Sequence, residues 1–508
     1  ALMANSAEIM FGLYENGQWT TKRLTDNATP DVAPVVAVND DSVFVAWRSV
    51  YVEDQSNVTD FGQSDKIMFQ RYDRKTKTWS DPDTLYNGTS GSVMAIQAAM
   101  LEDGTAAVTY TLDKSAADAV SSVNNYEIVY VVVDTEGNVV KNQQLTSDSS
   151  LDENPQITTV MLGGEEQFIL GWHNVTTIED EEGGQRTESD IRLASVDSDG
   201  NITTGEVSLA DSLSEATGGR NVAVAANFRF VRSTDPALSN LSLVWATTDA
   251  SGDQDKAGTG VLKAIRFVED GGQIHTSAVI DVAEMDEGAI IDAFSAYASG
   301  DNQIKAMILG SQYTGLEETD EEVYNPETEQ YEPLLLPASV SGMYTATETY
   351  KDAFDIEAVD ADLGSMLKGL PLPVQFTVVN NGIQLIKQVK ITVGGGDPVV
   401  FGADQIHLLP NGSLDLPVDY QVPDDKVVDP DYTVEVTYSD GTTLSKQGTI
   451  RLTIPDVGIS KIELNKEEDG LREFMVTLYN GSEVELAGSG QSGPGHHNAG
   501  FRRGHLPD

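Results

Sequence analysis

The chain contains no cysteine among its 508 residues. This absence excludes a disulfide framework and any zinc site built on thiolates, so packing or bound ions must stabilise the fold. The sequence also lacks an apolar run of about 18 residues, the length that a membrane-spanning helix needs. Its first residues, Ala1 to Asn5, lack the basic start and apolar core of a signal peptide. We therefore expect a chain that does not insert into a membrane.

Basic residues are scarce: 31 lysines and arginines stand against 81 acidic residues, which gives a formal net charge of -50. Such a field repels phosphate backbones and anionic lipids, so nucleic acid is not an expected partner. Two interpretations of the acidity stay open, a hydrated surface or carboxylate clusters that hold calcium. The missing cysteine and the loops rich in Asn, Thr and Asp favour an extracellular or cell-surface protein of bacterial type.

What the chain does contain is a long repeat. Ile-led strands begin at Ile9, Ile67, Ile128 and Ile191, which lie 58, 61 and 63 residues apart. A period of this size is typical of four-stranded units that bury their faces by stacking, and it predicts an all-β propeller over residues 7–360.

The repeat predicts five complete blades, over residues 30–90, 91–148, 149–213, 214–283 and 284–360. Residues 7–29 supply only the last two strands of a blade, so the propeller has about six blades, one of them incomplete. An open sheet edge is unfavourable. We therefore expect the two missing strands upstream in a longer multidomain protein; the alternative is that another segment completes the blade.

Two blade ends share a finer motif. Leu24-Thr25-Asp26 precedes Asp31-Val32-Ala33-Pro34, and Leu145-Thr146-Ser147-Asp148 precedes Asp152-Glu153-Asn154-Pro155. This pattern resembles the repeat of TolB-like six-bladed propellers. The segment Lys77-Thr78-Trp79-Ser80-Asp81-Pro82 resembles the end of a sialidase Asp-box blade, of which only Thr78-Trp79 match the box itself. The resemblances imply the propeller class and leave its family open.

The pattern of strands and turns in the sequence changes after a short linker at about residues 362–369. Phe376-Thr377-Val378-Val379-Asn380-Asn381-Gly382, Leu408-Leu409-Pro410-Asn411-Gly412 and Tyr432-Thr433-Val434 appear in the order of bacterial CARDB and related Ig-like adhesion domains. The resemblance covers residues 370–455 and implies an immunoglobulin-like β-sandwich that serves as a spacer on surface proteins. Residues 456–485 resemble the start of a second copy. We interpret residues 487–508 as a disordered tail or a vector-derived extension.

Long acidic loops follow the second strand of each predicted blade, and loops of this kind often carry function. The candidate ligand-binding residues lie at the ends of these strands: Arg48, Asp113, His173, Asn174 and Tyr313. For Trp47, Trp172 and Trp245, which occupy equivalent places, a core role is the stronger interpretation. Candidate calcium ligands lie in the loops: Glu179, Asp180, Asp249, Asp253 and Asp255. Asp197-x-Asp199-Gly200-Asn201 looks like the start of a calcium loop, but its twelfth position is Ser208, and a hairpin turn explains it better.

Two functions remain open. The first is an extracellular binding or adhesion propeller, displayed on Ig-like spacers, whose long-loop face takes a ligand such as a glycan or a surface protein. The alternative is a propeller-type carbohydrate-active enzyme, a glycoside hydrolase. No nucleophile elbow, P-loop or His-Glu-x-x-His motif is present, so no catalytic residue is identified. Arginines at the expected mouth are few (Arg48, Arg186 and Arg220), which disfavours a sialidase.

Overall fold

The computed structural model describes residues 7–15, 17–27, 29–50, 65–87, 92–114, 126–179, 185–209, 227–249, 259–271, 273–300, 302–325, 330–361, 371–422, 429–452, 457–468, 471–480 and 497–499. The chain divides into two compact units, Ala1–Lys351 and Asp352–Asp508. Within the described ranges, no helix has the length and apolar character to cross a membrane.

The first unit consists of a β-hairpin and five larger antiparallel sheets, which follow one another in chain order. The hairpin contains β1 (Met10–Glu15) and β2 (Gln18–Arg23). The sheets contain β3 (Asp31–Val38), β4 (Ser42–Ser49), β5 (Lys66–Asp73), β6 (Thr78–Trp79) and β7 (Asp83–Asn87); β8 (Ser92–Met100), β9 (Ala106–Asp113), β10 (Tyr126–Val133) and β11 (Val139–Gln144); β12 (Leu151–Leu162), β13 (Glu165–Glu179), β14 (Gln185–Val196) and β15 (Ile202–Ser208); β16 (Phe228–Arg232), β17 (Leu241–Asp249), β18 (Thr259–Asp270), β19 (Gln273–Thr276) and β20 (Ile280–Glu284); and β21 (Ala289–Ala298), β22 (Gln303–Asn325) and β23 (Gln330–Thr349). A 3-10 turn, η4 (Leu238–Asn240), precedes β17.

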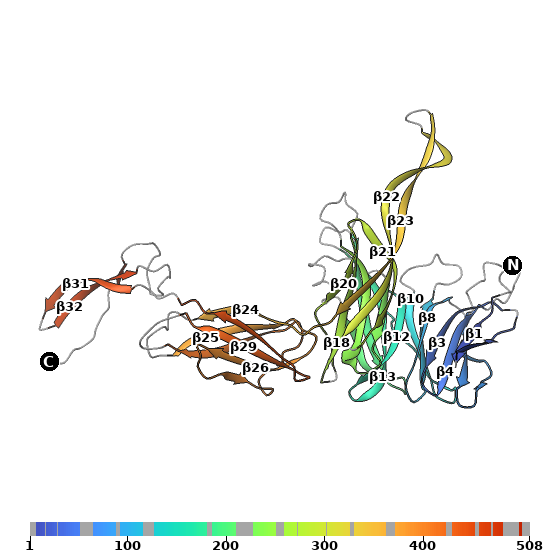
Figure 1. Ribbon diagram of the computed structural model, residues 1–508, viewed down its shortest axis with the longest axis horizontal. Helices are drawn as coiled ribbons and strands as arrows, with labels where there is room; N and C mark the ends of the chain where they lie inside the picture. The colour runs from blue at the N-terminus through green and yellow to red at the C-terminus, as the bar shows by residue number, and fades with distance from the viewer. Residues whose placement is uncertain are drawn as a thin grey trace. The chain divides into compact units, whose positions relative to one another are not determined.

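Successive sheets pack face to face through shared apolar clusters. Phe44 of the first sheet packs in one cluster with Val93 of the second. Tyr130 and Phe168 join the second sheet to the third, and further clusters join the third sheet to the fourth and the β1–β2 hairpin to the first sheet. The first strands β3, β8, β12, β16 and β21 are neighbours in that order, which Figure 1 shows as a row of sheets that runs from blue to yellow. The first unit is therefore a β-propeller, as the repeat predicts. It has five blades and a two-stranded sixth, but the fifth blade contains three strands rather than the four expected of a complete blade.

The Leu-Thr part of the repeat closes the second blade and the β1–β2 hairpin at their outer edges. In the second blade, the N–H of Leu145 donates to the carbonyl of Ile128 at 2.7 Å, and the N–H of Ile128 donates to Oγ1 of Thr146 at 2.9 Å. The hairpin β1–β2 repeats this pattern: the N–H of Leu24 donates to Ile9, whose own N–H donates to Thr25 at 2.9 Å. The motif therefore pins the end of the fourth strand to the Ile-led third strand.

The acidic turns between the third and fourth strands have a structural role. Oδ1 of Asp197 accepts the N–H groups of Asp199 at 3.0 Å and Asn201 at 2.7 Å, an arrangement that ties the carboxylate to its own hairpin. Gly200 has φ +80°, and a Cβ there would lie 2.3 Å from Cβ of Lys141 in the neighbouring blade. The hairpin interpretation of this calcium-like sequence is confirmed.

One of two predicted boundaries in the first unit needs correction. The apolar segment 221–228 predicts the first strand of the fourth blade; the structure describes this strand as β16, in which Phe228 pairs with Trp245, and residues 221–226 lie outside the described ranges. The fifth blade ends with β23 rather than at residue 360. The strand Phe354–Ala361 pairs with Pro371–Asn380, and Phe354 packs into the core of the second unit.

The second unit contains a β-sandwich of two antiparallel sheets around one apolar core. One sheet contains β24 (Phe354–Ala361), β25 (Pro371–Asn380) and β28 (Ser413–Gln421); the other contains β27 (Val399–Phe401), β26 (Ile386–Val393), β29 (Asp431–Tyr438) and β30 (Thr443–Thr449). The two turn motifs noted in the sequence contact each other. Nδ2 of the fully buried Asn380 donates to the carbonyl of Leu408 at 3.0 Å, and the N–H of Asn411 donates to the carbonyl of Asn380 at 2.8 Å.

A third sheet follows in the second unit, with β31 (Val457–Glu468), β32 (Leu471–Asn480) and β33 (His497–Ala499). The first two strands lie within residues 456–485, the range that resembles the start of a second Ig-like copy. Part of the segment interpreted as an unstructured tail differs from that expectation, since His497–Ala499 pairs with β32.

Candidate polar pocket of the propeller

The first strands of three consecutive blades carry the same irregularity. The register of β3, β8 and β12 shifts at one place each, and the shift contains a residue with positive φ: Ala33 at 50°, Ala95 at 49° and Asn154 at 51°. A β-bulge of this kind bends a strand and redirects its side chains. An aromatic residue of the second strand stands opposite each bulge, because the paired registers skip Trp47, Tyr110 and Trp172.

A buried aspartate fixes two of these aromatic residues. Oδ1 of Asp31 accepts the indole N–H of Trp47 at 3.1 Å, and Oδ1 of Asp152 accepts that of Trp172 at 2.9 Å. Both carboxylates are buried, with 2% and 0% exposure. This contact explains the Asp-x-x-Pro motif: the aspartate holds the indole, and the bulge follows directly. Trp47, Trp172 and Trp245 are core residues, with at most 2% exposure.

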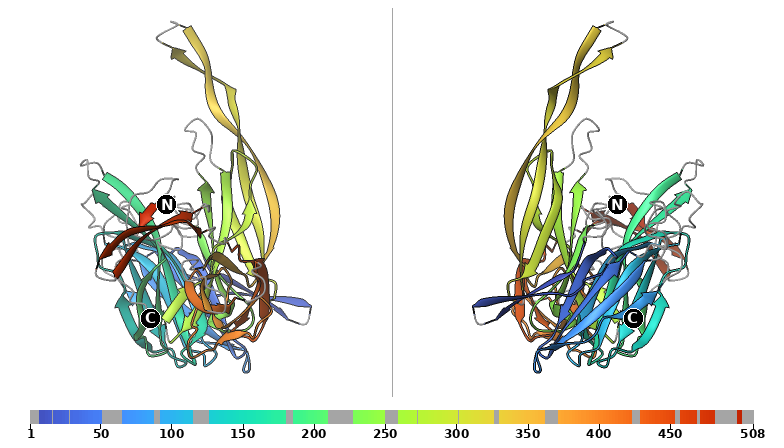
Figure 2. Two further views of the ribbon diagram at one scale, coloured as in Figure 1. Left: turned by 90° about the vertical axis from the view of Figure 1, so that its left-hand side faces the viewer. Right: turned by 90° about the vertical axis from the view of Figure 1, so that its right-hand side faces the viewer.

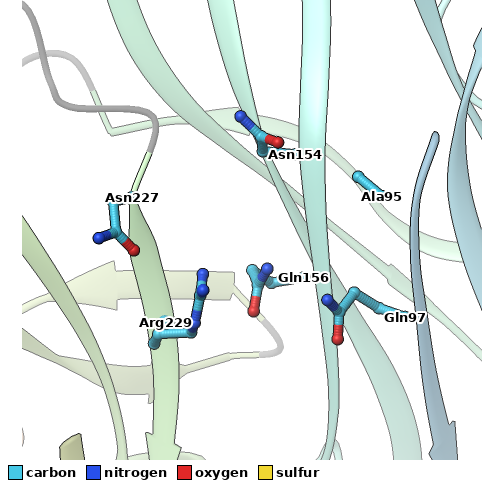
Figure 3. A pocket seen from close by; sticks show the side chains of 6 residues that line it. All are labelled: Ala95, Gln97, Asn154, Gln156, Asn227 and Arg229. Atoms are coloured by element: carbon cyan, nitrogen blue, oxygen red, sulfur yellow. The ribbon is translucent and has the colours of Figure 1, made fainter. Parts of the chain in front are cut away.

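A cavity of about 420 Å³ opens against the bulged strands (Figure 3). Its lining comes from β8, β12 and the start of β16, and consists of Ala95, Gln97, Asn154, Gln156, Asn227 and Arg229. Three of these positions are equivalent in the repeat. Gln97 pairs with Thr109, Gln156 with Gly171 and Arg229 with Val244, each of which directly precedes the large aromatic residue of its second strand. Ala95, Asn154 and Asn227 stand two residues earlier on the same strands.

The chemistry of this lining is polar and almost neutral. Each Gln or Asn side chain offers two donors and an acceptor, and no carboxylate is among the described lining residues. The single charged group is Arg229. Its Nη1 donates to the carbonyl of Phe228 at 2.7 Å, and burial lowers the pKa of its guanidinium. The pocket thus presents hydrogen-bonding groups of both kinds and one cation to a ligand.

Arg48 and Asp113, two of the predicted ligand-binding residues, lie at the joint between the first two blades. Nη2 of Arg48 is 2.7 Å from Oδ2 of Asp65, whose side chain is fully buried, and 3.2 Å from Oγ of Ser92. Asp113 is the register partner of Ser92. The structure thus brings the two predicted residues to one place, and neither lines the pocket.

His173 and Asn174 tie together the strands of the third blade. His173 is 6% exposed; its Nδ1 lies 3.1 Å from Oε1 of Glu153, and its Nε2 lies 2.5 Å from Oγ of Ser189. Asn174 is 1% exposed, and its Nδ2 donates to Oδ1 of Asp152 at 2.7 Å. Although a Glu-His-Ser chain has the order of groups found in acyl-transfer triads, none of its members lines the pocket.

The remaining predicted site residues lie at the limits of the described part of the chain. Asp180, Asp253 and Asp255 lie outside the described ranges. Tyr313, Glu179 and Asp249 belong to β22, β13 and β17, but their side chains lie outside the description. Across the ranges that the structure describes, no group of three or more His, Cys, Asp or Glu side chains could hold a metal ion. These candidates therefore stay predictions.

The pocket residues were missed because sequence reasoning placed the site on loops after the second strand. The signal was nonetheless present: Asn154 lies inside the Asp-x-x-Pro motif, and Gln156 follows it by two residues. Arg229 was missed for another reason, since the first strand of its blade was expected to end at Phe228.

The chain matches no protein-family profile and no curated protein. Solved structures with a similar arrangement share little sequence with it. They include an α-L-arabinanase from Penicillium chrysogenum complexed with arabinobiose, with 10% identity over 60% of this chain and 81% of that one and a TM-score of 0.36. A Trypanosoma rangeli sialidase mutant that displays trans-sialidase activity has 9% identity over 95% and 84%, and a TM-score of 0.34. A family 117 glycoside hydrolase from Zobellia galactanivorans has 11% identity over 68% and 91%, and a TM-score of 0.30.

Proposed function

We propose that the propeller is a carbohydrate-binding module and that its ligand occupies the polar pocket of β8, β12 and β16. The observation that carries this proposal is the lining itself. The carboxamides of Gln97, Gln156, Asn154 and Asn227 come from three consecutive blades and surround one cavity. A volume of about 420 Å³ falls within the range of about 300–1,000 Å³ that is usual for small-ligand pockets.

Carboxamides suit sugars for a simple reason. A sugar hydroxyl both donates and accepts a hydrogen bond. A carboxamide can form both bonds with it, as donor through its NH₂ group and as acceptor through its carbonyl oxygen. Gln97, Asn154 and Gln156 belong to strands rather than to loops, and strand positions hold binding groups more rigidly. A ligand therefore meets a partly preorganised set of donors and acceptors, which lowers the entropy lost on binding.

The second unit fits the role of a spacer. Its seven-stranded sandwich has a core of its own, and the contact between the Asn380 turn and the Leu408 loop accounts for two of the motifs that resemble CARDB domains. We place the chain at the cell surface or outside the cell, where an Ig-like sandwich of this kind would hold the propeller away from its point of attachment. Location is tested by fractionating cells of the source organism with an antibody to the propeller.

Glycan hydrolysis is the second candidate function. A glycosidase needs a pair of carboxyl groups about 5–10 Å apart. The carboxylate residue Glu153 directly precedes the lining residue Asn154 in the sequence. Its side chain is 27% exposed and contacts His173. No carboxylate is among the described lining residues, so we propose binding without cleavage as the first of the two functions.

A glycan array followed by a hydrolysis screen separates the two candidates. The intact chain should bind a subset of glycans on the array and release no sugar from them on prolonged incubation. The variant Glu153→Gln should retain binding. Release of sugar by the wild-type chain, lost in Glu153→Gln while binding persists, would replace the binding function by the enzymatic one. Binding to no glycan at all would contradict both.

A further inference from the structure

The pocket contains one residue that differs in kind from its equivalents. The matched position holds Gln97 in the second blade, Gln156 in the third and Arg229 in the fourth. A neutral polar residue would complete the same amide lining. The fourth blade instead places a permanent positive charge in the cavity, in a chain with only 31 basic residues and a net charge of -50.

This cation has no acidic partner within the part of the chain that the structure describes. Two other cations of the propeller have acidic partners: Arg48 pairs with Asp65 at 2.7 Å, and Lys263 pairs with Asp281 at 2.6 Å. Nη1 of Arg229 donates a hydrogen bond to the neutral carbonyl of Phe228 at 2.7 Å. Arg229 is exposed to the cavity and to solvent, so a bound anion can reach its guanidinium and pair with it.

The shape of the guanidinium indicates which anion. With Nη1 engaged by Phe228, the edge formed by Nε and Nη2 has no partner among the described residues. Two parallel N–H groups on that edge match the two oxygens of a planar carboxylate, which is the strongest pairing that arginine makes with an organic acid. The neighbouring amides remain available for hydroxyl groups.

We infer that the pocket selects glycans that carry a carboxylate, with Arg229 as the residue that binds the acid and Gln97, Gln156, Asn154 and Asn227 as partners of the hydroxyls. This inference rests on the proposed function and adds its ligand class. The ligand is an acidic sugar of the uronic or sialic type, recognised through its carboxyl group, in spite of the repulsion that the acidic surface exerts on anions.

Matched pairs of glycans test the inference. The array carries uronate-containing and sialylated oligosaccharides, each beside its own methyl ester, which keeps every hydroxyl and removes the charge. Titration calorimetry then measures the affinities of the best-bound acid and its ester for four proteins: the wild-type chain, Arg229→Gln, Arg229→Lys and Lys75→Gln. Arg229→Gln installs the residue of the equivalent positions, and Lys75→Gln removes a charge from an exposed turn of the first blade as a control.

The wild-type chain should bind the acid about tenfold or more tightly than the ester, as expected for a hydrogen bond to a charged group. Arg229→Gln should bind both members with the affinity of the ester, Arg229→Lys should show a smaller preference for the acid, and Lys75→Gln should behave as wild type. Melting temperatures within two degrees or so of wild type show that the variants fold, since Arg229 lies at an exposed position.

Each contrary result has a distinct meaning. Equal wild-type affinity for acid and ester would overturn the carboxylate inference and leave glycan binding intact. An acid preference that survives in Arg229→Gln would assign the selectivity to another residue and would also overturn the inference. Binding restricted to sulfated probes would overturn the inference as well. Failure of both members to bind would overturn the proposed function together with the inference.

Discussion

Asp152 accepts the indole N–H of Trp172 at 2.9 Å. The pair joins the core of the third blade to its pocket, because Asp152 is fully buried and stands two residues before the bulge residue Asn154. The same short segment thus holds the largest aromatic side chain of the blade and directs Asn154 and Gln156 towards the cavity. The pair Asp31–Trp47 in the first blade repeats the contact.

We expect Asp152→Ala to destabilise the propeller by roughly 2–4 kcal/mol, because it leaves two buried donors, Trp172 Nε1 and Asn174 Nδ2, without their acceptor. Urea denaturation followed by tryptophan fluorescence measures the change. The control is Asp199→Ala, which removes an exposed carboxylate. Equal midpoints for the two variants would show that the buried aspartate has no structural role.

Replacing Ala33 by glycine should leave the stability unchanged or raise it by up to about 1 kcal/mol. Ala33 has φ 50°, and the left-handed conformation costs an alanine roughly 1–2 kcal/mol; glycine avoids that strain but gains about 0.4–1 kcal/mol of entropy in the unfolded chain. Gly200→Ala should have the opposite sign, since its Cβ would lie 2.3 Å from Cβ of Lys141. Denaturation midpoints check both, and a clear loss of stability in Ala33→Gly would refute the bulge argument.

Stability should depend on pH in two stages. Burial raises the pKa of Asp152 and Asp190, so the folded chain binds these protons more tightly than the unfolded chain does. Protonation of these carboxyls therefore favours folding. When charged they lower the free energy of unfolding, and this loss of stability disappears as the pH falls through their raised pKa values towards about 4. Hydrogen bonds from Thr25 and from Asn138 lower the pKa of Glu8 and Asp134, respectively, and the stability they confer is lost as the pH falls through those lower values.

The melting temperature should accordingly rise as the pH decreases from 8 to about 5 and fall below about 4. Relief of repulsion among the 81 acidic residues acts in the same direction as the first stage. Asp190→Asn separates the causes, because it removes one raised carboxyl and changes the net charge by a single unit. A rise of equal size in this variant would exclude Asp190 as a cause of the pH dependence.

Residues 1–351 should fold without the second unit, because the two units have separate cores. We expect a β-type circular dichroism spectrum and one cooperative melting transition for the isolated propeller. A spectrum without tertiary signal, or a broad transition, would mean that the propeller needs the sandwich in order to fold.

Calcium binding by the acidic loops, with Asp180, Asp253 and Asp255 as candidate ligands, stays a prediction. An ion held only by the native state at a hundredfold excess over Kd stabilises it by about 2.7 kcal/mol, so chelation should lower the melting temperature. Solvated carboxylates respond instead to ionic strength alone. Coincident melting curves with calcium and with chelator, at fixed ionic strength, would eliminate the ion.

The repeat made the propeller predictable because it is local: Ile-led strands, Asx-Gly turns and the Leu-Thr and Asp-x-x-Pro segments each determine a contact within one blade. The pairing of Asp152 with Trp172 cannot be predicted from the repeat, since a motif shows that an aspartate recurs but not which side chain it contacts. Blade four shows the limit more sharply. Phe228 belongs to the strand only because it pairs with Trp245, and that pairing is tertiary information.

The pocket depends on such information throughout. Gln97, Gln156 and Arg229 lie in three blades, and their equivalence becomes visible only after the strands are in register. The predicted residues Arg48 and His173 had the right chemistry for a site, but they form contacts inside the protein, with Asp65 in one case and with Glu153 and Ser189 in the other. A polar residue at a strand end is therefore a weaker indicator of a site than a matched polar position on three neighbouring inner strands.

The most direct test of the central claim is calorimetric titration of the strongest ligand from the array into the wild-type chain, into Gln97→Ala/Gln156→Ala and into the control Gln18→Ala, which removes an exposed amide from β2. Two lost hydrogen bonds of about 1 kcal/mol each should weaken binding by the double variant about tenfold or more, with Gln18→Ala and all melting temperatures unchanged. Wild-type affinity in the double variant would place the ligand elsewhere and contradict the account.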